Sequence, residues 1–145
     1  MKKLYFAYGS NLNKGQMKYR CPYARPVGKV SLFGYELVFR GVADIKKTNN
    51  PENRIEGGLW EITERCEKAL DIYEGVASEL YKKITIGGIL TYKMNKRPEQ
   101  SPSINYFDII LEGYHDFGLD TTWLYDAAGW KFWNEKEGNN GRSYL

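Results

Sequence analysis

The segment from residue 55 to residue 94 limits the fold more than any other part of this 145-residue chain. Residues 55–62, IEGGLWEI, have the composition of a strand. Thr63 can serve as an N-cap, and after it apolar residues recur at i, i+3, i+4 and i+7 over residues 66–73, which predicts an amphipathic helix. In residues 81–94, apolar and polar residues alternate on both sides of a Gly-Gly pair, which predicts a hairpin. Strands that are mostly antiparallel neighbours, with helices inserted between them, favour an α+β fold over a βαβ series.

The rest of the chain carries weaker signals of the same kind. Residues 27–40 are interpreted as one long strand, bent or bulged at Gly34, and residues 43–53 as a polar loop around an Asn-Asn-Pro turn. The other predicted elements are a strand over residues 3–8, a short helix between Asn11 and Cys21, a loop over residues 95–103, a helix with Tyr106, Ile109, Ile110 and Gly113 on one face, and a short helix from Asp120 to Ala128.

Composition limits the chain to one globular domain. Hydrophobic residues make up 42% and aromatic residues 15% of the sequence, which argues against a disordered chain. The net charge is only +3, and basic residues occur as scattered pairs such as Lys46-Lys47, so nucleic-acid binding is not expected. No apolar stretch is long enough to span a bilayer, and the apolar run after Lys2-Lys3 is too short for a signal peptide. We therefore expect a cytoplasmic protein with no membrane partner.

Few residues are available for metal or nucleophilic chemistry. Cys21 and Cys66 lie in unrelated contexts and are expected to be reduced and buried. The single histidine, His115, is interpreted as a surface residue, since no serine or cysteine stands in a nucleophile motif such as G-x-S-x-G. A zinc site would need carboxylates from scattered positions. We therefore expect no metal and no cofactor.

The nine residues LYFAYGSNL, residues 4–12, join a predicted buried strand to a turn. A strand that ends in glycine and opens a helix aims several N–H groups at one point, which suits a carboxylate, a phosphate or a developing oxyanion. Most turns of this kind do no more than cap a helix. The pattern alone therefore leaves both interpretations open.

Glu74 directly precedes Gly75, at which the predicted helix ends. A helix C-terminus carries partial negative charge, and Tyr73 and Val76 suggest apolar surroundings. Both effects would raise the pKa of the carboxyl group toward neutrality, which suits a group that shuttles protons. An exposed glutamate with a small energetic penalty explains the same pattern equally well.

Four short motifs occur here in an order and spacing that resemble the γ-glutamylcyclotransferase-like family. They are YFAYGSNL, the RCP of residues 20–22, GGLWEIT and LDIYEGV. The similarity runs from about residue 3 to about residue 119 and includes INYFDIILEGY. It implies an α+β fold in which a mixed β-barrel is flanked by helices, with a pocket at the mouth of the barrel.

The resemblance also implies a reaction. A γ-glutamyl amide is cleaved by attack of its own α-amine, which releases 5-oxoproline and a free amine without hydrolysis. In the family the glutamate of the E-G-V segment is the acid/base, a role that falls on Glu74, and the Y-G-S-N loop holds the γ-glutamyl group. The implied substrate-binding residues are Tyr5, Phe6, Ala7, Tyr8, Gly9, Ser10, Asn11, Leu12, Tyr92 and Tyr106.

An acyl transferase of this type needs no covalent nucleophile, because the attacking amine is tethered to the carbonyl. The alternative is a catalytically idle binding module on the same scaffold, which captures a small anionic ligand or a protein partner. The sequence does not name the leaving amine, whose half of the site is expected to be lined by residues 43–53 and 95–103. The expected partner is a small γ-glutamyl substrate, and the expected state is a monomer or a homodimer.

The resemblance ends near residue 120. We therefore predict a γ-glutamylcyclotransferase-like domain over residues 1–128 and a partly packed C-terminal tail over residues 129–145. Trp130, Phe132 and Trp133 in this tail carry a large apolar area and are expected to pack against the domain. The sharper alternative is that they reach the rim of the pocket or a partner subunit.

Overall fold

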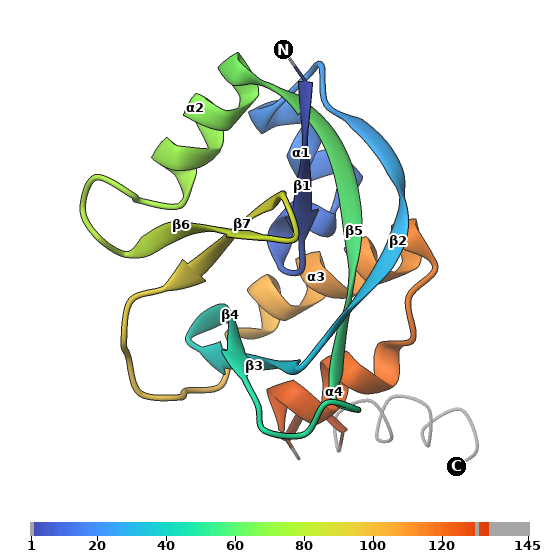
Figure 1. Ribbon diagram of the computed structural model, residues 1–145. Helices are drawn as coiled ribbons and strands as arrows, with labels where there is room; N and C mark the ends of the chain where they lie inside the picture. The colour runs from blue at the N-terminus through green and yellow to red at the C-terminus, as the bar shows by residue number, and fades with distance from the viewer. Residues whose placement is uncertain (1, 130, 134–145) are drawn as a thin grey trace.

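The computed structural model describes residues 2–129 and 131–133 (Figure 1). The strands are β1 (Lys2–Ala7), β2 (Arg25–Phe33), β3 (Tyr35–Arg40), β4 (Val42–Lys47), β5 (Arg54–Thr63), β6 (Tyr81–Ile86) and β7 (Ile89–Met94). The helices are a short 3-10 helix η1 (Ser10–Leu12) and the α-helices α1 (Lys14–Arg20), α2 (Glu64–Tyr73), α3 (Ile104–Phe117) and α4 (Thr121–Ala128). This arrangement confirms the predicted α+β class.

The strands form a five-stranded sheet in the order β2-β5-β1-β7-β6 and a two-stranded sheet of β3 and β4. β5 pairs antiparallel with both β1 and β2, whereas β1 and β7 are parallel, so the larger sheet is mixed. The first strand thus lies in the middle of the sheet, and the turn that follows it opens at the centre of the fold. Closure of these strands into a barrel stays a prediction.

Two predictions for residues 27–53 are wrong. The expected long strand is divided at Gly34, whose φ of 82° makes it a turn between β2 and β3 in different sheets. Residues 43–47 of the expected polar loop belong to β4, which pairs with β3. This strand was not predicted because it contains the acidic Asp44. Asp44 is nevertheless buried, since Arg40 Nε and the Met94 N–H both donate to its carboxylate, at 2.7 and 2.8 Å.

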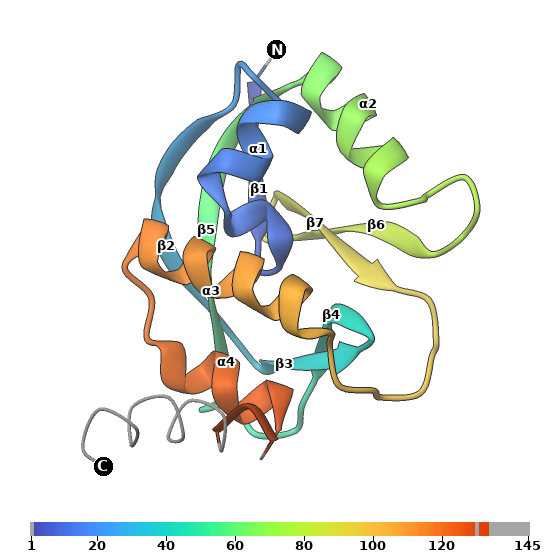
Figure 2. The same cartoon turned by 180° about the vertical axis from the view of Figure 1, so that it is seen from behind.

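The predicted helices and the hairpin are confirmed. The Thr63 hydroxyl accepts a hydrogen bond from the Cys66 N–H and caps α2, and the Asp120 carboxylate caps α4 by accepting from the Thr122 N–H. Gly75 has a φ of 64°, as expected for the glycine after a helix. β6 and β7 pair in register around Gly87-Gly88. Figure 2, the view from behind, shows α1 and α3 in front of the larger sheet, and α4 below them beside β3.

The turn after β1 is held in place by α3. Leu12 and Ala7 are fully buried, and Gly113 of α3 lies so close to the turn that a Cβ there would approach the Leu12 Cβ to 2.6 Å. Only a glycine allows the helix to pack against the backbone at this point. Packing of α3 therefore fixes where the turn residues lie.

Cys21 and Cys66 form a disulfide, which corrects the expectation that both are reduced. Cys21 follows the last residue of α1, Cys66 lies in the first turn of α2, and their Cα atoms are 5.1 Å apart, within the usual range for a disulfide. The sequence separation of 45 residues concealed this proximity, because only the packing of α1 against α2 brings the two together. The bond joins two helices that carry parts of the candidate site.

The described part of the tail packs on the domain. Phe132 is buried, with its ring 4.5 Å from that of Phe107 in α3, and the Trp133 ring lies 5.1 Å from that of Tyr125 in α4. Trp130 lies outside the described residues, and the division at residue 128 stays a prediction. None of the described helices is long and apolar enough to cross a membrane.

Candidate active site

A cavity of about 210 Å³ opens where the end of β1 meets the end of α2. The turn after β1 forms one wall, the start of β4 and the first turn of α3 form another, and α2, β6 and β7 complete it. Its lining residues are Tyr5, Tyr8, Gly9, Ser10, Asn11, Val42, Ala43, Tyr73, Glu74, Leu80, Tyr81, Tyr92 and Tyr106.

Glu74 is the one carboxylic acid among these lining residues. It is the C-cap of α2, where the helix ends before Gly75. Burial raises the pKa of Glu74 from its usual 4.5 to about 7, and the positive charge of Arg20 partly opposes this rise. The predicted rise is thus present, and desolvation is its main cause. A group with this pKa can accept and return a proton at neutral pH.

Asn11 connects Glu74 to the rest of the site. Its Nδ2 donates to Glu74 Oε1 at 3.3 Å and to the Tyr5 hydroxyl at 2.9 Å. Arg20 Nη1 donates to Asn11 Oδ1 at 2.8 Å, and since a guanidinium only donates, this contact fixes which end of the amide faces Glu74. Trp60 Nε1 donates to the Asn11 carbonyl oxygen at 2.9 Å and holds the backbone as well.

Every buried tyrosine hydroxyl in the cavity has a partner. Tyr8 donates to the Tyr92 carbonyl oxygen, Tyr81 to the Ala43 carbonyl oxygen and Tyr92 to Asp71 Oδ1, while Tyr106 accepts from the Ala43 N–H at 3.1 Å. Burial raises the pKa of these tyrosines and of Tyr5 well above the usual value. They therefore remain neutral hydrogen-bonding groups at any physiological pH.

The turn itself supplies backbone donors and close packing. Among the described residues, the hydrogen bonds assign no acceptor to the N–H groups of Gly9, Ser10 and Asn11. A Cβ at Gly9 would lie 3.1 Å from the Ala43 Cβ and 3.4 Å from the Tyr106 hydroxyl oxygen. The glycine is thus needed for space on the cavity wall, and its φ of −120° makes no special demand.

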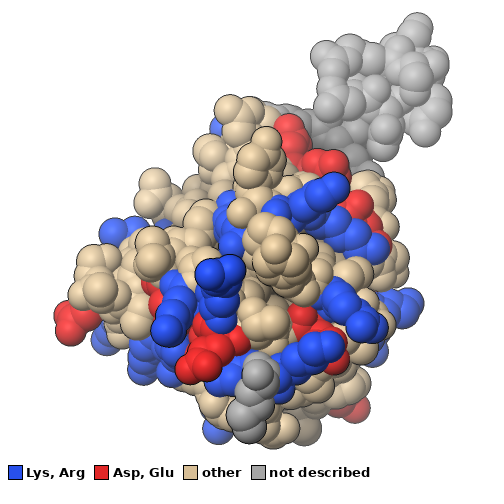
Figure 3. All heavy atoms as spheres, turned by 90° about the horizontal axis from the view of Figure 1, so that it is seen from above, with Lys and Arg blue, Asp and Glu red and all other residues tan. Residues whose placement is uncertain are grey.

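A charged network behind the cavity orients Tyr92. Asp71, which accepts from the Tyr92 hydroxyl at 2.6 Å, forms an ion pair with Lys83 at 3.0 Å, and Lys83 also contacts Glu67. Figure 3 shows basic and acidic side chains interspersed over the face that carries α2. Within the part of the chain that the structure describes, no three His, Cys, Asp or Glu side chains are grouped so that they could hold a metal ion.

Most of the predicted site residues meet in this cavity. Glu74, Tyr5, Tyr8, Gly9, Ser10, Asn11, Tyr92 and Tyr106 all line it. Phe6, Ala7 and Leu12 do not, because they point into the core beside the turn. Of the two loops expected around the leaving amine, residues 43–53 contribute Ala43 and residues 95–103 contribute no lining residue.

Sequence reasoning missed several residues that the fold brings to the site. Tyr73 lines the cavity and its hydroxyl is hydrogen-bonded to Ser10 Oγ at 2.9 Å. Arg20 lies behind it, with the guanidinium 3.5 Å from the centre of the Tyr73 ring. Tyr81, Val42 and Leu80 also line the cavity and were not assigned. Arg20 and Tyr73 already stood inside the quoted RCP and LDIYEGV motifs, so those motifs were the available signal.

The chain is similar in sequence and in fold to known proteins. The sequence model of the AIG2-like family matches residues 54–126. A γ-glutamylcyclotransferase from Bos taurus is 29% identical over an alignment 141 positions long, which covers 80% of this chain and 72% of the bovine protein. A solved structure of a γ-glutamyl cyclotransferase superposes with a TM-score of 0.74 at 26% identity, covering 86% of this chain and 85% of the other. An uncharacterised human protein gives a TM-score of 0.74 at 27% identity, covering 85% and 84% of the two chains.

Proposed function

Since this chain belongs to the AIG2-like family and shares the fold of γ-glutamylcyclotransferases, we propose that it is an enzyme that cyclises a γ-glutamyl amide. The substrate's α-amine attacks its own γ-carbonyl carbon. A C–N bond forms in the new five-membered ring, and the amide C–N bond to the leaving amine breaks. The products are 5-oxoproline and a free amine, with no water consumed.

Glu74 is the acid/base in this proposal. It takes a proton from the α-ammonium group, which makes the nitrogen nucleophilic, and it then delivers that proton to the leaving nitrogen. One carboxyl group suffices for both transfers because they follow one another. The attacking nitrogen must lose one further proton to become the lactam N–H, and the freed amine takes up that proton and leaves as an ammonium ion. The observation that carries the proposal is a carboxyl group with a pKa of about 7 inside a cavity that is lined by no other carboxylic acid and by five tyrosines whose pKa burial raises.

The turn after β1 would hold the glutamyl half of the substrate. Its three consecutive N–H groups suit the substrate's α-carboxylate or the oxyanion that forms on the γ-carbonyl oxygen. The hydrogen-bonded tyrosines need little rearrangement when the substrate binds, and holding the amine beside the carbonyl can supply several kcal/mol of the barrier. Val42 and Leu80 give the cavity an apolar portion for the leaving amine.

The test is release of 5-oxoproline from a panel of γ-glutamyl dipeptides and γ-glutamyl-ε-lysine. We expect at least one to be converted, and Glu74→Gln to lower the rate of conversion by about two to four orders of magnitude. Binding of 5-oxoproline without turnover of any substrate would favour the alternative, a catalytically idle binding module. Neither turnover nor binding would contradict both assignments.

A further inference from the structure

Arg20, the first residue of the RCP segment, lies beside the candidate active site without lining it. It is the last residue of α1, it is half-buried, and it takes no part in the ion pairs of the described residues. Its guanidinium contacts three neutral side chains. Nη1 donates to Asn11 Oδ1 at 2.8 Å, Nη2 donates to Gln16 Oε1 at 2.7 Å, and the group lies 3.5 Å from the centre of the Tyr73 ring. The proposed reaction assigns no role to this cation.

The side chain of Asn11 uses all of its polar atoms. Its Nδ2 donates to the Tyr5 hydroxyl at 2.9 Å and to Glu74 Oε1 at 3.3 Å, and its Oδ1 accepts from Arg20. Asn11 is only 2% exposed, so bulk water cannot replace a partner that is lost. The amide therefore depends on these three neighbours for its orientation.

Arg20 is the neighbour that decides this orientation. A half-turn of the amide would exchange Nδ2 and Oδ1 of Asn11. The Tyr5 hydroxyl tolerates either end, since a hydroxyl both donates and accepts. Glu74 also tolerates either end, because its ionised form accepts and its protonated form can donate. A guanidinium only donates, so only Oδ1 can face Arg20 and only Nδ2 can face Glu74.

A second contact of Arg20 reaches the cavity wall through Tyr73. The guanidinium stacks on the Tyr73 ring, and the Tyr73 hydroxyl is hydrogen-bonded to Ser10 Oγ at 2.9 Å. Tyr73 is the last residue of α2, directly before Glu74, and Ser10 belongs to the turn after β1. Arg20 thus connects the two segments that carry the acid/base and the glutamyl-binding turn.

From these contacts we propose that Arg20 is a positioning residue for the reaction, which keeps Asn11 a hydrogen-bond donor to Glu74 and holds Tyr73 beside Ser10. This inference rests on the proposed function. A donor next to Glu74 favours the ionised carboxylate, the form that takes the proton from the substrate's α-ammonium group. Without Arg20 the amide is free to turn and accept from protonated Glu74, which favours the acid instead.

The charge of Arg20 acts in the same direction as the hydrogen bond. Burial raises the pKa of Glu74 to about 7, and the positive charge of Arg20 partly opposes this rise. Loss of Arg20 removes both the charge and the fixed donor, so both effects raise the pKa of Glu74 further. The other titratable residues on the cavity wall are all tyrosines, namely Tyr5, Tyr8, Tyr73, Tyr81, Tyr92 and Tyr106.

The experiment compares the intact wild-type protein with Arg20→Gln. The glutamine carries no charge, and its amide donates or accepts, so it does not fix the orientation of Asn11. The titration midpoint of the Glu74 carboxyl carbon, followed by ¹³C NMR, should lie above that of the wild type. Release of 5-oxoproline near pH 7 should fall roughly 100-fold, and its pH profile should move to higher pH with the midpoint. Arg20→Met takes the place of Arg20→Gln, with the same expectations, if the latter does not fold.

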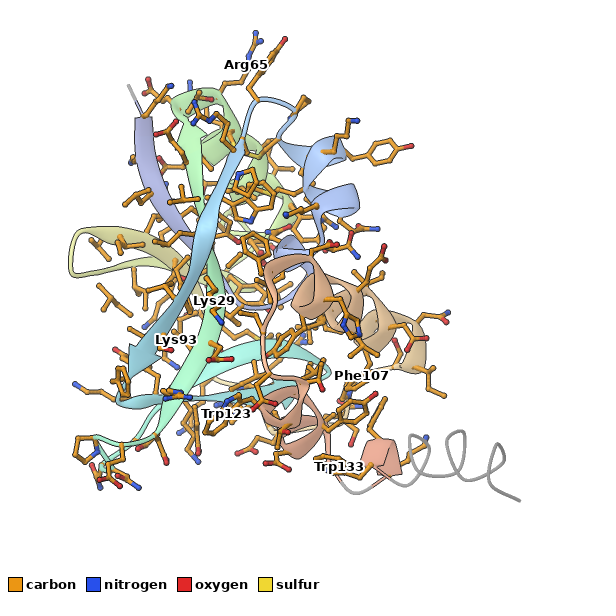
Figure 4. The ribbon with its side chains drawn as sticks, turned by 90° about the vertical axis from the view of Figure 1, so that its right-hand side faces the viewer. Lys29, Arg65, Lys93, Phe107, Trp123 and Trp133 are labelled. Carbon is orange, nitrogen blue, oxygen red and sulfur yellow. A yellow bond between two sulfur atoms is a disulfide. The ribbon has the colours of Figure 1, made fainter. Side chains whose placement is uncertain are left out.

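Two further variants separate this role from a general effect of removing an arginine. Arg65→Gln makes the same change on α2, where Arg65 is exposed and points outward at one end of the molecule (Figure 4). It should leave the midpoint and the rate at their wild-type values. Arg20→Lys keeps a cation that only donates, and it should return the Glu74 midpoint toward that of the wild type.

Two tryptophans show whether the change stays local. Trp60 Nε1 donates to the Asn11 carbonyl oxygen, whereas Trp123 of α4 lies next to the strands at a distance from Arg65 (Figure 4). In a ¹H–¹⁵N spectrum of Arg20→Gln, the indole N–H resonance of Trp60 should shift and that of Trp123 should not. Shifts of similar size at both would indicate a general loss of packing and would overturn the proposal.

The Glu74 midpoint separates a positioning role from a purely structural one. If Arg20 does no more than join α1 to α2, Arg20→Gln lowers the stability and the rate but leaves the midpoint unchanged, which would overturn the proposal. The midpoint is measured without turnover. Absence of turnover in the wild type would therefore contradict the proposed function, whereas wild-type turnover with an unchanged midpoint in Arg20→Gln would contradict the positioning role alone.

Discussion

Two cavities meet α3 and differ in how the polar groups beside them are paired. The first is the candidate active site, and the second, of about 240 Å³, is lined by residues that include Arg54, Tyr114 and Trp123. Tyr106 and Tyr114 lie about two turns apart on α3. The Tyr106 hydroxyl accepts from the Ala43 N–H in the first cavity, whereas the Tyr114 hydroxyl has no partner among the described residues in the second. The same contrast holds for the other polar groups, since Tyr5, Tyr8, Tyr81 and Tyr92 are all hydrogen-bonded.

This difference separates a preorganised site from a region whose donor atoms are buried without partners among the described residues. In a fully paired network, hydroxyl and amide groups are already oriented before the substrate arrives, which is what catalysis requires. Glu74 is the exception in the first cavity, because it is desolvated and Asn11, at 3.3 Å, is the one hydrogen-bond partner of its side chain among the described residues. The three unpaired donor atoms beside the second cavity, the Tyr114 hydroxyl, Trp123 Nε1 and Arg54 Nε, are buried from solvent, so they are not presented to the space inside it.

The largest effect is expected from Glu74→Gln. Loss of the acid/base should lower turnover by about two to four orders of magnitude, because proton transfer by a positioned side chain contributes about that much. The amide can still accept from Asn11, so the fold and the Trp123 resonance should not change. Steady-state release of 5-oxoproline measures the effect.

Glu64→Gln is the matched control for this substitution. Glu64 is an exposed glutamate at the opposite end of the same helix, α2. Its removal should leave turnover at the wild-type level. Wild-type activity in Glu74→Gln would contradict the acid/base role.

The second largest effect is expected from reduction of the Cys21–Cys66 disulfide, which should affect the first cavity more than the second. A cross-link across 45 residues contributes about 4 kcal/mol through restriction of the unfolded chain. The bond joins α1 and α2, which carry Arg20 and Glu74, and neither helix contributes to the second cavity. In urea titrations the reduced protein should be less stable, and its Trp60 resonance should shift more than that of Trp123. Equal stability of the oxidised and reduced proteins would contradict this.

The burial of Glu74 should make the stability of the protein depend on pH. The folded-state pKa of about 7 lies above the usual 4.5, so the folded protein binds more protons between these two values. Stability should therefore be greatest below about pH 4.5 as far as this group is concerned, and it should fall as the pH rises to 7. At pH 8 the free energy of unfolding of Glu74→Gln should be larger than that of the wild type by on the order of 2–3 kcal/mol.

Chemical denaturation of both proteins at pH 5 and pH 8 measures this difference. The gain of Glu74→Gln should be small at pH 5 and large at pH 8. A gain that is the same at both pH values would show that Glu74 is not the cause.

The two α3 tyrosines provide the smallest and most specific comparison. Tyr106→Phe should destabilise the protein by about 1–3 kcal/mol, because the Ala43 N–H loses its acceptor. Tyr114→Phe should cost nothing measurable, because no described group is hydrogen-bonded to its hydroxyl. Equal losses in urea titrations would mean that the two cavities do not differ as described.

The sequence predicted the local structure well where the signal is local. The i, i+3, i+4, i+7 spacing before Gly75 gives α2, and the Gly-Gly pair gives the β6–β7 hairpin. It failed where a distant partner decides. The sequence predicts a loop at Asp44, because the hydrogen bonds from Arg40 and the Met94 N–H to its carboxylate form only in the folded protein. No sequence pattern connects Cys21 with Cys66, which lies 45 residues away.

The candidate site shows the same division. The motifs identified Glu74 and the Y-G-S-N turn, and burial in the cavity explains why the pKa of the glutamate is raised. The residues that hold the lining residues in place could not be predicted from local patterns. Arg20, for example, reaches Asn11 only through the packing of α1 against the turn. The unpaired donors of the second cavity come from β5, α3 and α4, and no spacing in the sequence connects them.

The most direct test is a measurement of the pKa of Glu74. The side-chain carboxyl carbon of ¹³C-labelled protein can be followed by NMR from pH 4 to pH 9, with Glu74→Gln to assign its signal. Burial in the first cavity predicts a midpoint of about 7, and the exposed Glu64 provides a reference in the same titration. The pH dependence of 5-oxoproline release should follow the same midpoint. A Glu74 midpoint near the usual 4.5 would contradict the desolvated acid/base on which the proposed function rests.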